Sequence, residues 1–309
     1  MNLNPSTQKI LFEHEPILNE LIKLYKENKL PNKILLSGEK GIGKSTLGYH
    51  LVNFVLSENE EYSYNSEIFE INPENKSYKL LQNKSNPNFN LVDVAEDRKN
   101  IDIHQIRKLI INLNISSFNN KPRFVLIDNI DLLNVNSVNA LLKVLEEPND
   151  NIFFILINNN KKILPTLKSR CLSFKVFLTN KQSIKIINQL LSDDIYNIVN
   201  IELLDNYITP GKLLNIIKLL NQYEIDIKKI NLREFLSFMI NDKIYKKDKT
   251  FSFIIFSYIE LYFRKNISVK NISLLKLYQY FLTKINNAKI YNLDEETLFM
   301  EFEEKVLNG

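Results

Sequence analysis

The sequence is poor in the residues that build disulfides, metal centres and redox sites. Cys171 is the only cysteine among 309 residues, and the three histidines, His14, His50 and His104, lie far apart. One cysteine cannot form a disulfide within the chain, and none of these spacings is that of a metal-binding pair. The sequence therefore supports neither a zinc site nor a redox pair.

Long apolar runs and a strong charge imbalance are lacking as well. The longest apolar stretch, FSFIIFSYIELYF, is too short and too interrupted to span a bilayer, and the first residues have no apolar core of a secretory signal. We therefore expect a cytoplasmic protein that contacts no membrane. The net charge is only +4 and is spread over both halves. A protein that holds DNA alone usually concentrates its positive charge, so we expect any contact with nucleic acid to be shared with partner proteins.

Apolar strands alternate with amphipathic helices over the first part of the chain. A content of 44% hydrophobic and 25% charged residues is typical of a chain that forms a packed core. Solidly apolar strands separated by helices are typical of a parallel sheet covered by helices. The sequence therefore predicts an α/β domain at 1–177, with helices near 15–28, 44–57, 102–114 and 135–147 and strands near 34–36, 89–95, 123–128, 152–157 and 172–177.

The remainder of the chain shows only helical periodicity after Leu178. A break at Thr209-Pro210-Gly211 starts one helix, and the polar stretch 224–231 indicates a boundary within this helical part. Helices beyond the boundary carry large apolar residues on more than one face, which is typical either of a core of their own or of burial against partner subunits. We expect two all-α domains, at 178–221 and at 222–309.

Glycine is scarce in the chain but concentrated in one short window. The stretch GEKGIGKST fits the pattern G-x-x-x-x-G-K-[ST] of a phosphate-binding P-loop, directly after a strand and at the start of a helix. Main-chain N–H groups of such a loop surround phosphates, the lysine reaches the β- and γ-phosphates, and the serine hydroxyl ligates Mg²⁺. The alternative is a glycine-rich turn without a ligand. The pattern predicts that ATP or ADP binds with Mg²⁺ at Gly38, Gly41, Gly43, Lys44, Ser45 and Thr46.

A second acidic group is needed to order the metal, and Asp128 follows the apolar strand FVLI. We predict that Ser45 and Asp128 hold the Mg²⁺ ion, although an aspartate that only ends a strand is common. The next position, where many ATPases place a glutamate to activate water, is Asn129, and an amide cannot act as a general base. Asp131 is nearby but shifted in register. We therefore expect weak or absent intrinsic ATP hydrolysis.

Four segments together carry a resemblance to a known family. They are LPNKILLSGEKGIGKSTLGYHL (30–51), IHQIRKLI (103–110), NALLKVLEEP (139–148) and ILPTLKSRC (163–171). In this order, with the strand before Asp128, they resemble the clamp-loader branch of the AAA+ ATPases, and within it the delta-prime family of bacterial DNA polymerase III subunits. The resemblance covers roughly 11–177. It implies that the helical remainder is a small lid at 178–221 followed by a collar domain at 222–309 that mediates oligomerisation. By itself NALLKVLEEP would be an ordinary amphipathic helix that Pro148 ends.

The resemblance also implies roles for residues that the sequence alone would leave unassigned. Arg170, in the Ser-Arg-Cys motif, is the residue that reaches ATP bound by a neighbouring subunit, where a guanidinium stabilises charge on the γ-phosphoryl group. Asn158 or Asn159 corresponds to the polar residue called sensor 1. Cys171 then needs no reactive role and is expected to be a packed apolar residue.

Three departures from the family pattern qualify these implications. Many relatives carry a four-cysteine zinc module before the second acidic motif, but 58–100 contains no cysteine, so we carry over no zinc. The basic sensor 2 residue of motor subunits has no clear equivalent, since Gly211 lies near its position with Lys212 beside it. Many delta-prime proteins have a decayed P-loop, whereas this one is intact.

Three functions remain open at this stage. The favoured one is a stator of the clamp loader that binds nucleotide and supplies Arg170 to a neighbour. Its partners would be gamma/tau-like motor subunits and a delta-like subunit, with the sliding clamp and primed DNA reached through the complex. The second is a motor subunit that hydrolyses ATP itself, against which Asn129 and the missing sensor 2 residue argue. The third is an unrelated P-loop kinase, but 46–97 holds no arginine for a substrate site or lid.

Overall fold

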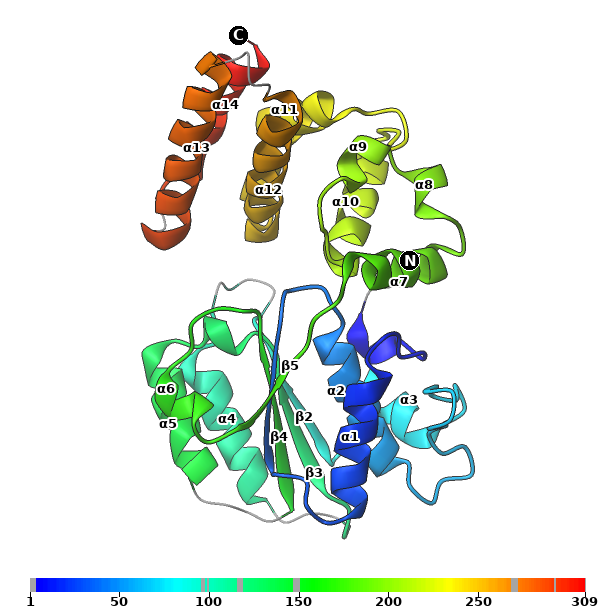
Figure 1. The fold of residues 1–309 in the computed structure, drawn as a ribbon. Coiled ribbons are helices and arrows are strands. Elements are labelled where there is room, and N and C mark those ends of the chain that lie inside the picture. Colours follow the sequence, from blue (N-terminus) through cyan, green and yellow to red (C-terminus); the bar gives the residue numbers. More distant parts are fainter. Residues whose placement is uncertain are drawn as a thin grey trace. The chain divides into compact units, whose positions relative to one another are not determined.

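The computed structural model describes residues 4–95, 98, 100–115, 119–146, 151–267, 272–291 and 293–308. The chain divides into two compact units, Met1–Gln182 and Ser183–Gly309, which are described separately (Figure 1). The sequence places its first boundary between 177 and 178. No helix in the described part of the chain is long and apolar enough to cross a membrane.

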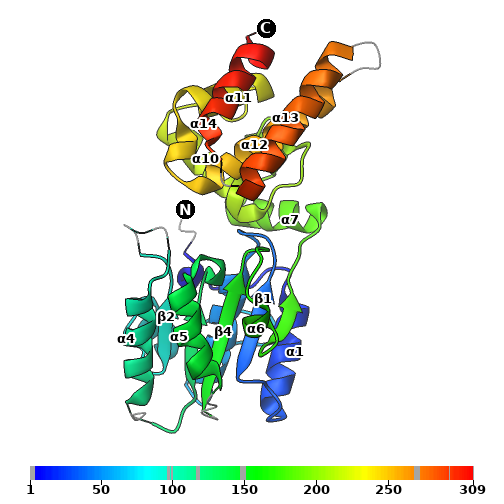
Figure 2. The same ribbon diagram turned by 90° about the vertical axis from the view of Figure 1, so that its left-hand side faces the viewer.

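The first unit is built on a parallel sheet with the strand order β2-β3-β4-β1-β5. Its strands are β1 (Lys33–Ser37), β2 (Phe89–Val92), β3 (Arg123–Ile127), β4 (Ile152–Asn158) and β5 (Leu172–Lys175). Its helices are α1 (Glu15–Lys26), α2 (Lys44–Leu56), α3 (Lys76–Gln82), α4 (Ile103–Asn114), α5 (Val135–Glu146) and α6 (Pro165–Lys168). Helices α1, α2 and α3 lie on one side of the sheet, and α4, α5 and α6 lie on the other (Figures 1 and 2). The predicted parallel sheet between helices is confirmed.

Burial on both faces explains why the strands read as continuous apolar runs. All five residues of β3 are buried, and Val125 packs with Leu109 of α4 and Leu141 of α5 in one core cluster. Parallel sheets of this kind leave no solvated face for polar side chains in the middle of the strands. In the central strands β1, β3 and β4 polar side chains occur only at the first or last residue, so the polar groups of the site lie at or beyond the strand ends.

The ends of strand β2 and helix α5 differ in how they compare with the predicted boundaries. The strand predicted at 89–95 ends at Val92, because the carbonyl of Asp93 accepts a hydrogen bond from the Gln105 side chain (2.7 Å) instead of continuing the ladder. Helix α5 is described up to Glu146, so the predicted stop at Pro148 lies outside the described residues.

The described part of the second unit contains helices and no strands, as predicted. Helix α7 (Asn180–Leu191) crosses the division between the units. It is followed by α8 (Ile195–Ile198), α9 (Ile201–Leu204), α10 (Pro210–Gln222), α11 (Leu232–Asn241), α12 (Lys249–Asn266), α13 (Ile272–Tyr291) and α14 (Glu295–Phe302). Helix α12 contains the longest apolar stretch of the sequence.

Most of the large side chains of α12 lie in the core of their own unit. Phe256 and Phe263 are fully buried, and the ring of Phe263 packs against Phe281 and Phe302 with centroids 5.9 and 5.7 Å apart. Phe253, by contrast, is 39% exposed. The apolar coverage of this helix is thus explained within the chain and does not by itself indicate a partner. The oligomerisation role of 222–309 stays a prediction.

The first unit contains an internal cap for helix α4. The buried guanidinium of Arg123, at the start of β3, donates to the main-chain oxygens of Asn112 (2.6 Å), Leu113 (3.0 Å) and Ile115 (2.8 Å). These carbonyls lie at the C-terminal end of α4, where a helix leaves its last acceptors without partners inside the helix. A cation there satisfies the acceptors and complements the helix dipole.

We predict that Arg123→Met lowers the free energy of unfolding by about 2–3 kcal/mol, because hydrogen bonds from a charged donor are lost and buried carbonyls remain unpaired. Urea denaturation followed by circular dichroism measures this change. Arg107→Met is the matched control, since Arg107 lies on the same helix but is exposed and should change stability by less than about 0.5 kcal/mol. Equal losses in the two variants would contradict the capping role.

Candidate nucleotide-binding site

The P-loop follows β1 and ends where α2 begins at Lys44. Gly43 has φ of +94°, a backbone conformation that other residues rarely adopt. At Gly38 a Cβ atom would lie 2.1 Å from the carbonyl oxygen of Val176, so only glycine fits this close approach of two backbones. The loop therefore needs glycine at both defining positions for reasons of its own geometry.

Lys44 is buried, and its ammonium group lies at the loop. It donates to the carbonyl oxygens of Gly38 (2.9 Å) and Glu39 (2.5 Å) and to Oδ1 of Asn159 (3.0 Å). A buried ammonium requires such acceptors, because burial without them is costly. The cation is thus held where phosphates bound by the loop would meet it.

Ser45, in the first turn of α2, lies next to Asp128, which directly follows β3. The hydroxyl of Ser45 donates to Oδ2 of Asp128 at 2.5 Å. Burial raises the pKa of Asp128, while the hydrogen bond from Ser45 acts in the opposite direction. A hydroxyl oxygen and a carboxylate oxygen this close together are hard oxygen ligands of the kind that Mg²⁺ prefers. The two residues therefore fit the predicted metal, which would favour the charged form of Asp128.

A set of side-chain amides lies beside Lys44. Nδ2 of Asn159 donates to Oδ1 of Asn129 (2.7 Å), and the main-chain N–H of Asn159 donates to Asp131 (3.3 Å). The Asp131 carboxylate is buried and pairs with Lys161 at 2.9 Å. Asn158 instead donates to the carbonyl oxygen of Lys161 (3.0 Å). Of the two asparagines considered from the sequence, the structure brings Asn159 and not Asn158 to the P-loop lysine.

His14, which no sequence motif selects, lies against the P-loop. His14 is 2% exposed, and its Nε2 lies 2.5 Å from the carbonyl oxygen of Ile42, the residue before Gly43. Burial lowers the pKa of His14, so the ring is neutral at pH 7 and donates its single proton to this carbonyl. A lone histidine in a sequence carries no signal for such a contact.

Asp93 is a second residue that the sequence did not indicate. It directly follows β2, and its Oδ1 accepts a hydrogen bond from Nδ2 of Asn129 (2.7 Å). The polar groups from the ends of β1, β2, β3 and β4 thus meet at one edge of the sheet. In open parallel sheets ligands bind outside the carboxyl ends of the strands.

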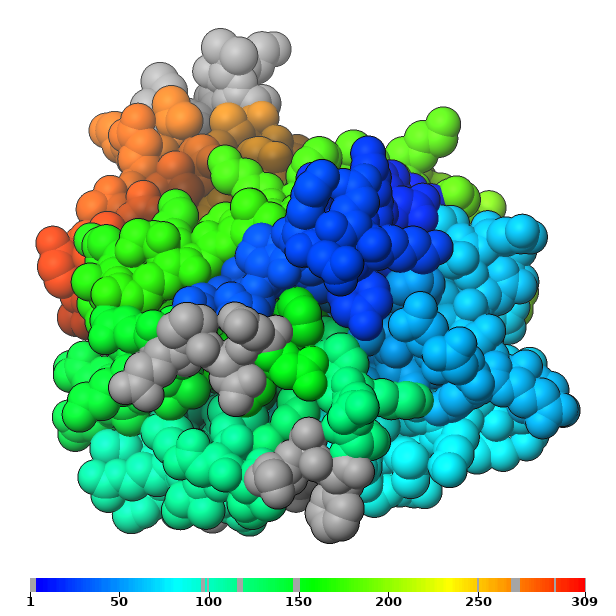
Figure 3. All heavy atoms as spheres, turned by 90° about the horizontal axis from the view of Figure 1, so that it is seen from below, coloured from blue at the N-terminus to red at the C-terminus, as the bar shows by residue number. Residues whose placement is uncertain are grey.

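Figure 3 shows the opposite end of the first unit, where the blue N-terminal segment lies between the green and light-blue segments.

Arg170 lies apart from these groups, just after α6. Its guanidinium pairs with Glu146 of α5 (2.6 Å) and donates to the carbonyl oxygen of Thr166 (2.8 Å), and its side chain is 34% exposed. Cys171, the next residue, donates to the carbonyl oxygen of Leu167, and burial raises the pKa of its thiol to about 11. A thiol of this kind is protonated at pH 7 and packs as an apolar group, as expected.

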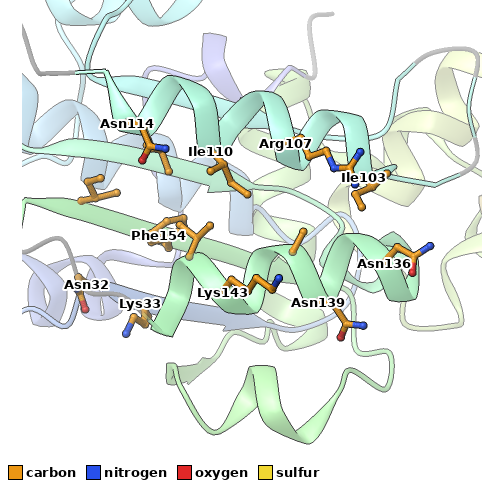
Figure 4. A pocket seen from close by; sticks show the side chains of 14 residues that line it. Asn32, Lys33, Ile103, Arg107, Ile110, Asn114, Asn136, Asn139, Lys143 and Phe154 are labelled. Atoms are coloured by element: carbon orange, nitrogen blue, oxygen red, sulfur yellow. The ribbon is translucent and has the colours of Figure 1, made fainter.

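A groove of about 790 Å³ runs between α4 and α5 (Figure 4). Arg107 of α4 and Lys143 of α5 are exposed along it, and Lys33 lies on the β1 side. Among the residues that the structure describes, the rest of its lining is amide or apolar and none is acidic. These residues are Asn32, Ile103, Ile110, Leu113, Asn114, Asn136, Asn139, Ala140, Val144, Ile152 and Phe154. The groove is therefore a cationic surface on the helical side of the sheet opposite α1 and α2.

Comparisons with known proteins agree with the resemblance seen in the sequence. A family model described as DNA polymerase III, delta subunit, matches residues 13–179. The chain is 25% identical over 287 residues to DNA polymerase III subunit delta' of Buchnera aphidicola from Schizaphis graminum. This alignment covers 87% of this chain and 83% of the relative. It is 32% identical over 138 residues to subunit delta' of Pseudomonas aeruginosa, covering 44% of this chain and 40% of the relative.

Similarity extends to the gamma type of subunit. The chain is 24% identical over 285 residues to DNA polymerase III subunit gamma of Buchnera aphidicola from Acyrthosiphon pisum, covering 86% of this chain and 74% of the relative. Among solved structures, a DNA polymerase III gamma subunit-related protein from Thermotoga maritima matches with a TM-score of 0.47 and 19% identity, covering 91% of this chain and 96% of that one.

Proposed function

This chain belongs to the family of the DNA polymerase III delta subunit, and we propose that it is the stator of a clamp loader, which binds nucleotide and supplies Arg170 to a neighbouring ATPase subunit. The observation that carries the proposal is the meeting of Lys44, Ser45 and Asp128 around the P-loop. Relatives named delta' support the delta-prime type, and relatives named gamma support the kinship with motor subunits.

The nucleotide is ATP or ADP with Mg²⁺. Main-chain N–H groups of the loop bind its phosphates, Lys44 contacts the β- and γ-phosphates, and Ser45 and Asp128 hold the metal ion. The partners are gamma/tau-like motor subunits and a delta-like subunit, and the collar at 222–309 joins the chain to them. The sliding clamp and primed DNA are reached through this complex.

The first prediction concerns nucleotide binding by the isolated chain. ATP with Mg²⁺ should bind, and Lys44→Ala should abolish binding, because the loop loses the cation that faces the phosphates. Steady-state turnover should stay below about 1 s⁻¹, the low end for enzymes, because Asn129 offers no carboxylate at the usual position. Titration calorimetry and phosphate release measure the two quantities. Lys108→Ala, an exposed lysine on α4, is the control.

Two results would count against this part of the proposal. Absence of heat and of competition at millimolar nucleotide would remove the nucleotide-binding function. A turnover above about 1 s⁻¹ would favour the motor subunit instead.

The next prediction concerns Arg170 in the reconstituted loader. Arg170→Ala should leave this chain's own nucleotide affinity and its assembly unchanged, because the guanidinium contacts Glu146 and Thr166 and not the P-loop. DNA-stimulated ATP hydrolysis by the complex should fall several-fold, since one site loses a trans cation worth about 10³–10⁵ in rate at that site. Clamp loading should fall further, because it needs coordinated sites.

Glu146→Gln is the matched control for Arg170→Ala. It removes the partner of the guanidinium within the chain but keeps the guanidinium itself, so hydrolysis by the complex should persist. Lys44→Ala should likewise leave most of that hydrolysis intact if this chain is not a motor. The stator assignment is wrong if Lys44→Ala stops turnover while Arg170→Ala affects neither turnover nor clamp loading.

We also propose that the cationic groove between α4 and α5 contributes to the complex's contact with DNA. The described lining of the groove has three basic side chains and no acidic one. So few positive charges favour a phosphate contact shared with partner subunits over an independent DNA-binding site. Arg107→Ala/Lys143→Ala should weaken binding of the assembled loader to primed DNA and reduce the salt dependence of log K by up to about two units of slope. The double variant Lys23→Ala/Lys26→Ala removes the same charge from exposed positions of α1. Equal effects of the two double variants would argue against the groove.

A further inference from the structure

The site contains a carboxylate that none of the roles above uses. Asp93 directly follows β2, and the main-chain N–H of Asp128 donates to the carbonyl oxygen of Val92 (2.9 Å). Since Val92 is paired with Ile127 in the parallel ladder, Asp93 and Asp128 occupy equivalent positions beyond two neighbouring strands. Residues in register on adjacent strands project from the same face of a sheet. Asp93 therefore lies beside the residue predicted to hold Mg²⁺.

Asn129 connects Asp93 to the P-loop lysine. Its Nδ2 donates to Oδ1 of Asp93 (2.7 Å), and its own Oδ1 accepts from Nδ2 of Asn159 (2.7 Å). Asn159 in turn accepts from the ammonium group of Lys44 (3.0 Å). Asn129 adopts φ of +56°, a conformation that asparagine tolerates better than most residues. The amide is thus oriented on both sides, with its donor group turned to a carboxylate.

Asp93 differs from the other two carboxylates near Asn129 in what its oxygens do. Asp131 is neutralised by Lys161, and Asp128 accepts from Ser45. Both hydrogen bonds to the Asp93 carboxylate, from Asn129 and from the main-chain N–H of Val94 (2.7 Å), fall on Oδ1. Within the described ranges no hydrogen bond or ion pair occupies Oδ2.

The backbone of Asp93 is also fixed in place. Its carbonyl oxygen accepts from Nε2 of Gln105 (2.7 Å). Gln105 forms a capping box with Asp102 at the start of α4, in which each residue satisfies the other's main-chain N–H. A reactive group must be held by rigid surroundings to act efficiently. The cap of α4 provides that support here.

We propose that Asp93 is the general base of this nucleotide site and that Asn129 positions it. The inference rests on the proposed binding of ATP with Mg²⁺. Oδ2 of Asp93 takes a proton from a water molecule, whose oxygen forms a bond to the γ-phosphorus as the bond from that phosphorus to the β–γ bridging oxygen breaks. ADP and inorganic phosphate result, and Asp93 releases its proton to solvent. The carboxylate that many ATPases carry directly after the second acidic residue is thus supplied from the end of the neighbouring strand.

Slow turnover by the isolated chain is compatible with this assignment. General base catalysis contributes about 10²–10⁴ in rate, whereas a trans arginine contributes about 10³–10⁵. The isolated chain has no neighbour to provide such an arginine to its own phosphates. Its hydrolysis should therefore be detectable above the uncatalysed reaction but remain below about 1 s⁻¹.

The test combines single-turnover hydrolysis with calorimetry of ATP–Mg²⁺ binding to the full chain. Asp93→Asn should lower the hydrolysis rate at least about 10²-fold while the dissociation constant changes less than about twofold. The matched variant is Asp93→Asn/Asn129→Asp, which exchanges the carboxylate and the amide and preserves the hydrogen bond between them. It should recover most of the rate, because the carboxylate returns to the strand that carries it in many ATPases.

Each other outcome has a definite meaning. If wild type binds ATP but hydrolyses it no faster than the uncatalysed reaction, or if Asp93→Asn keeps the wild-type rate, the base assignment is overturned and the proposed function stands. The assignment also fails if Asp93→Asn loses ATP affinity, or if the exchanged variant binds ATP but stays as slow as Asp93→Asn. If wild type binds no ATP in calorimetry, the proposed nucleotide function itself fails and the base assignment fails with it.

Discussion

The parallel register of the first sheet is the constraint on which the rest of the site depends. Its strands run in the order β2-β3-β4-β1-β5, so four chain segments that are distant in sequence end at one edge. Both faces of the sheet are covered by helices, and in the central strands β1, β3 and β4 polar side chains occur only at the first or last residue. The phosphate loop, the acidic residues and the amides meet at the edge where the carboxyl ends of β1, β2, β3 and β4 come together.

The charged side chains at this edge explain why the site is suited to a phosphate group that carries a divalent cation. Lys44 lies against oxygens of the loop and of Asn159, while Asp93 and Asp128 directly follow the paired residues Val92 and Ile127. Burial and the nearby Asp93 both raise the pKa of Asp128. A divalent cation would favour the charged form of the Asp128 carboxylate and so oppose the rise in its pKa. A phosphate group would accept hydrogen bonds from the ammonium group of Lys44. A metal ion and a nucleotide bound together, as proposed, would thus satisfy both charged groups at once.

The sequence predicts this architecture well because its main signals are local. The P-loop pattern, the apolar strands and the change to purely helical periodicity each occupy a short window, and the structure confirms the fold they indicate. The choice between Asn158 and Asn159 is different, because successive residues at a strand end project to opposite sides. Asn158 closes β4 in register with Ser37, so the following residue turns toward Lys44. The roles of His14 and Asp93 could not be predicted from local patterns either, because their contacts join segments far apart in sequence.

Periodicity also cannot tell a core from an interface, as α12 shows. Its apolar residues on several faces suggested partner contacts, yet Phe256 and Phe263 are buried within their own unit. The family match covers 13–179 and so concerns the first unit, while the similarity to subunits delta' and gamma of Buchnera aphidicola extends over 287 and 285 residues. Within the first unit the two sets of functional groups are physically separate: Lys44, Ser45 and Asp128 belong to the strand edge, whereas Arg170 is held by α5 and α6. Under the proposed stator role, this separation would let a change at the strand edge leave the contacts of Arg170 with Glu146 and Thr166 in place.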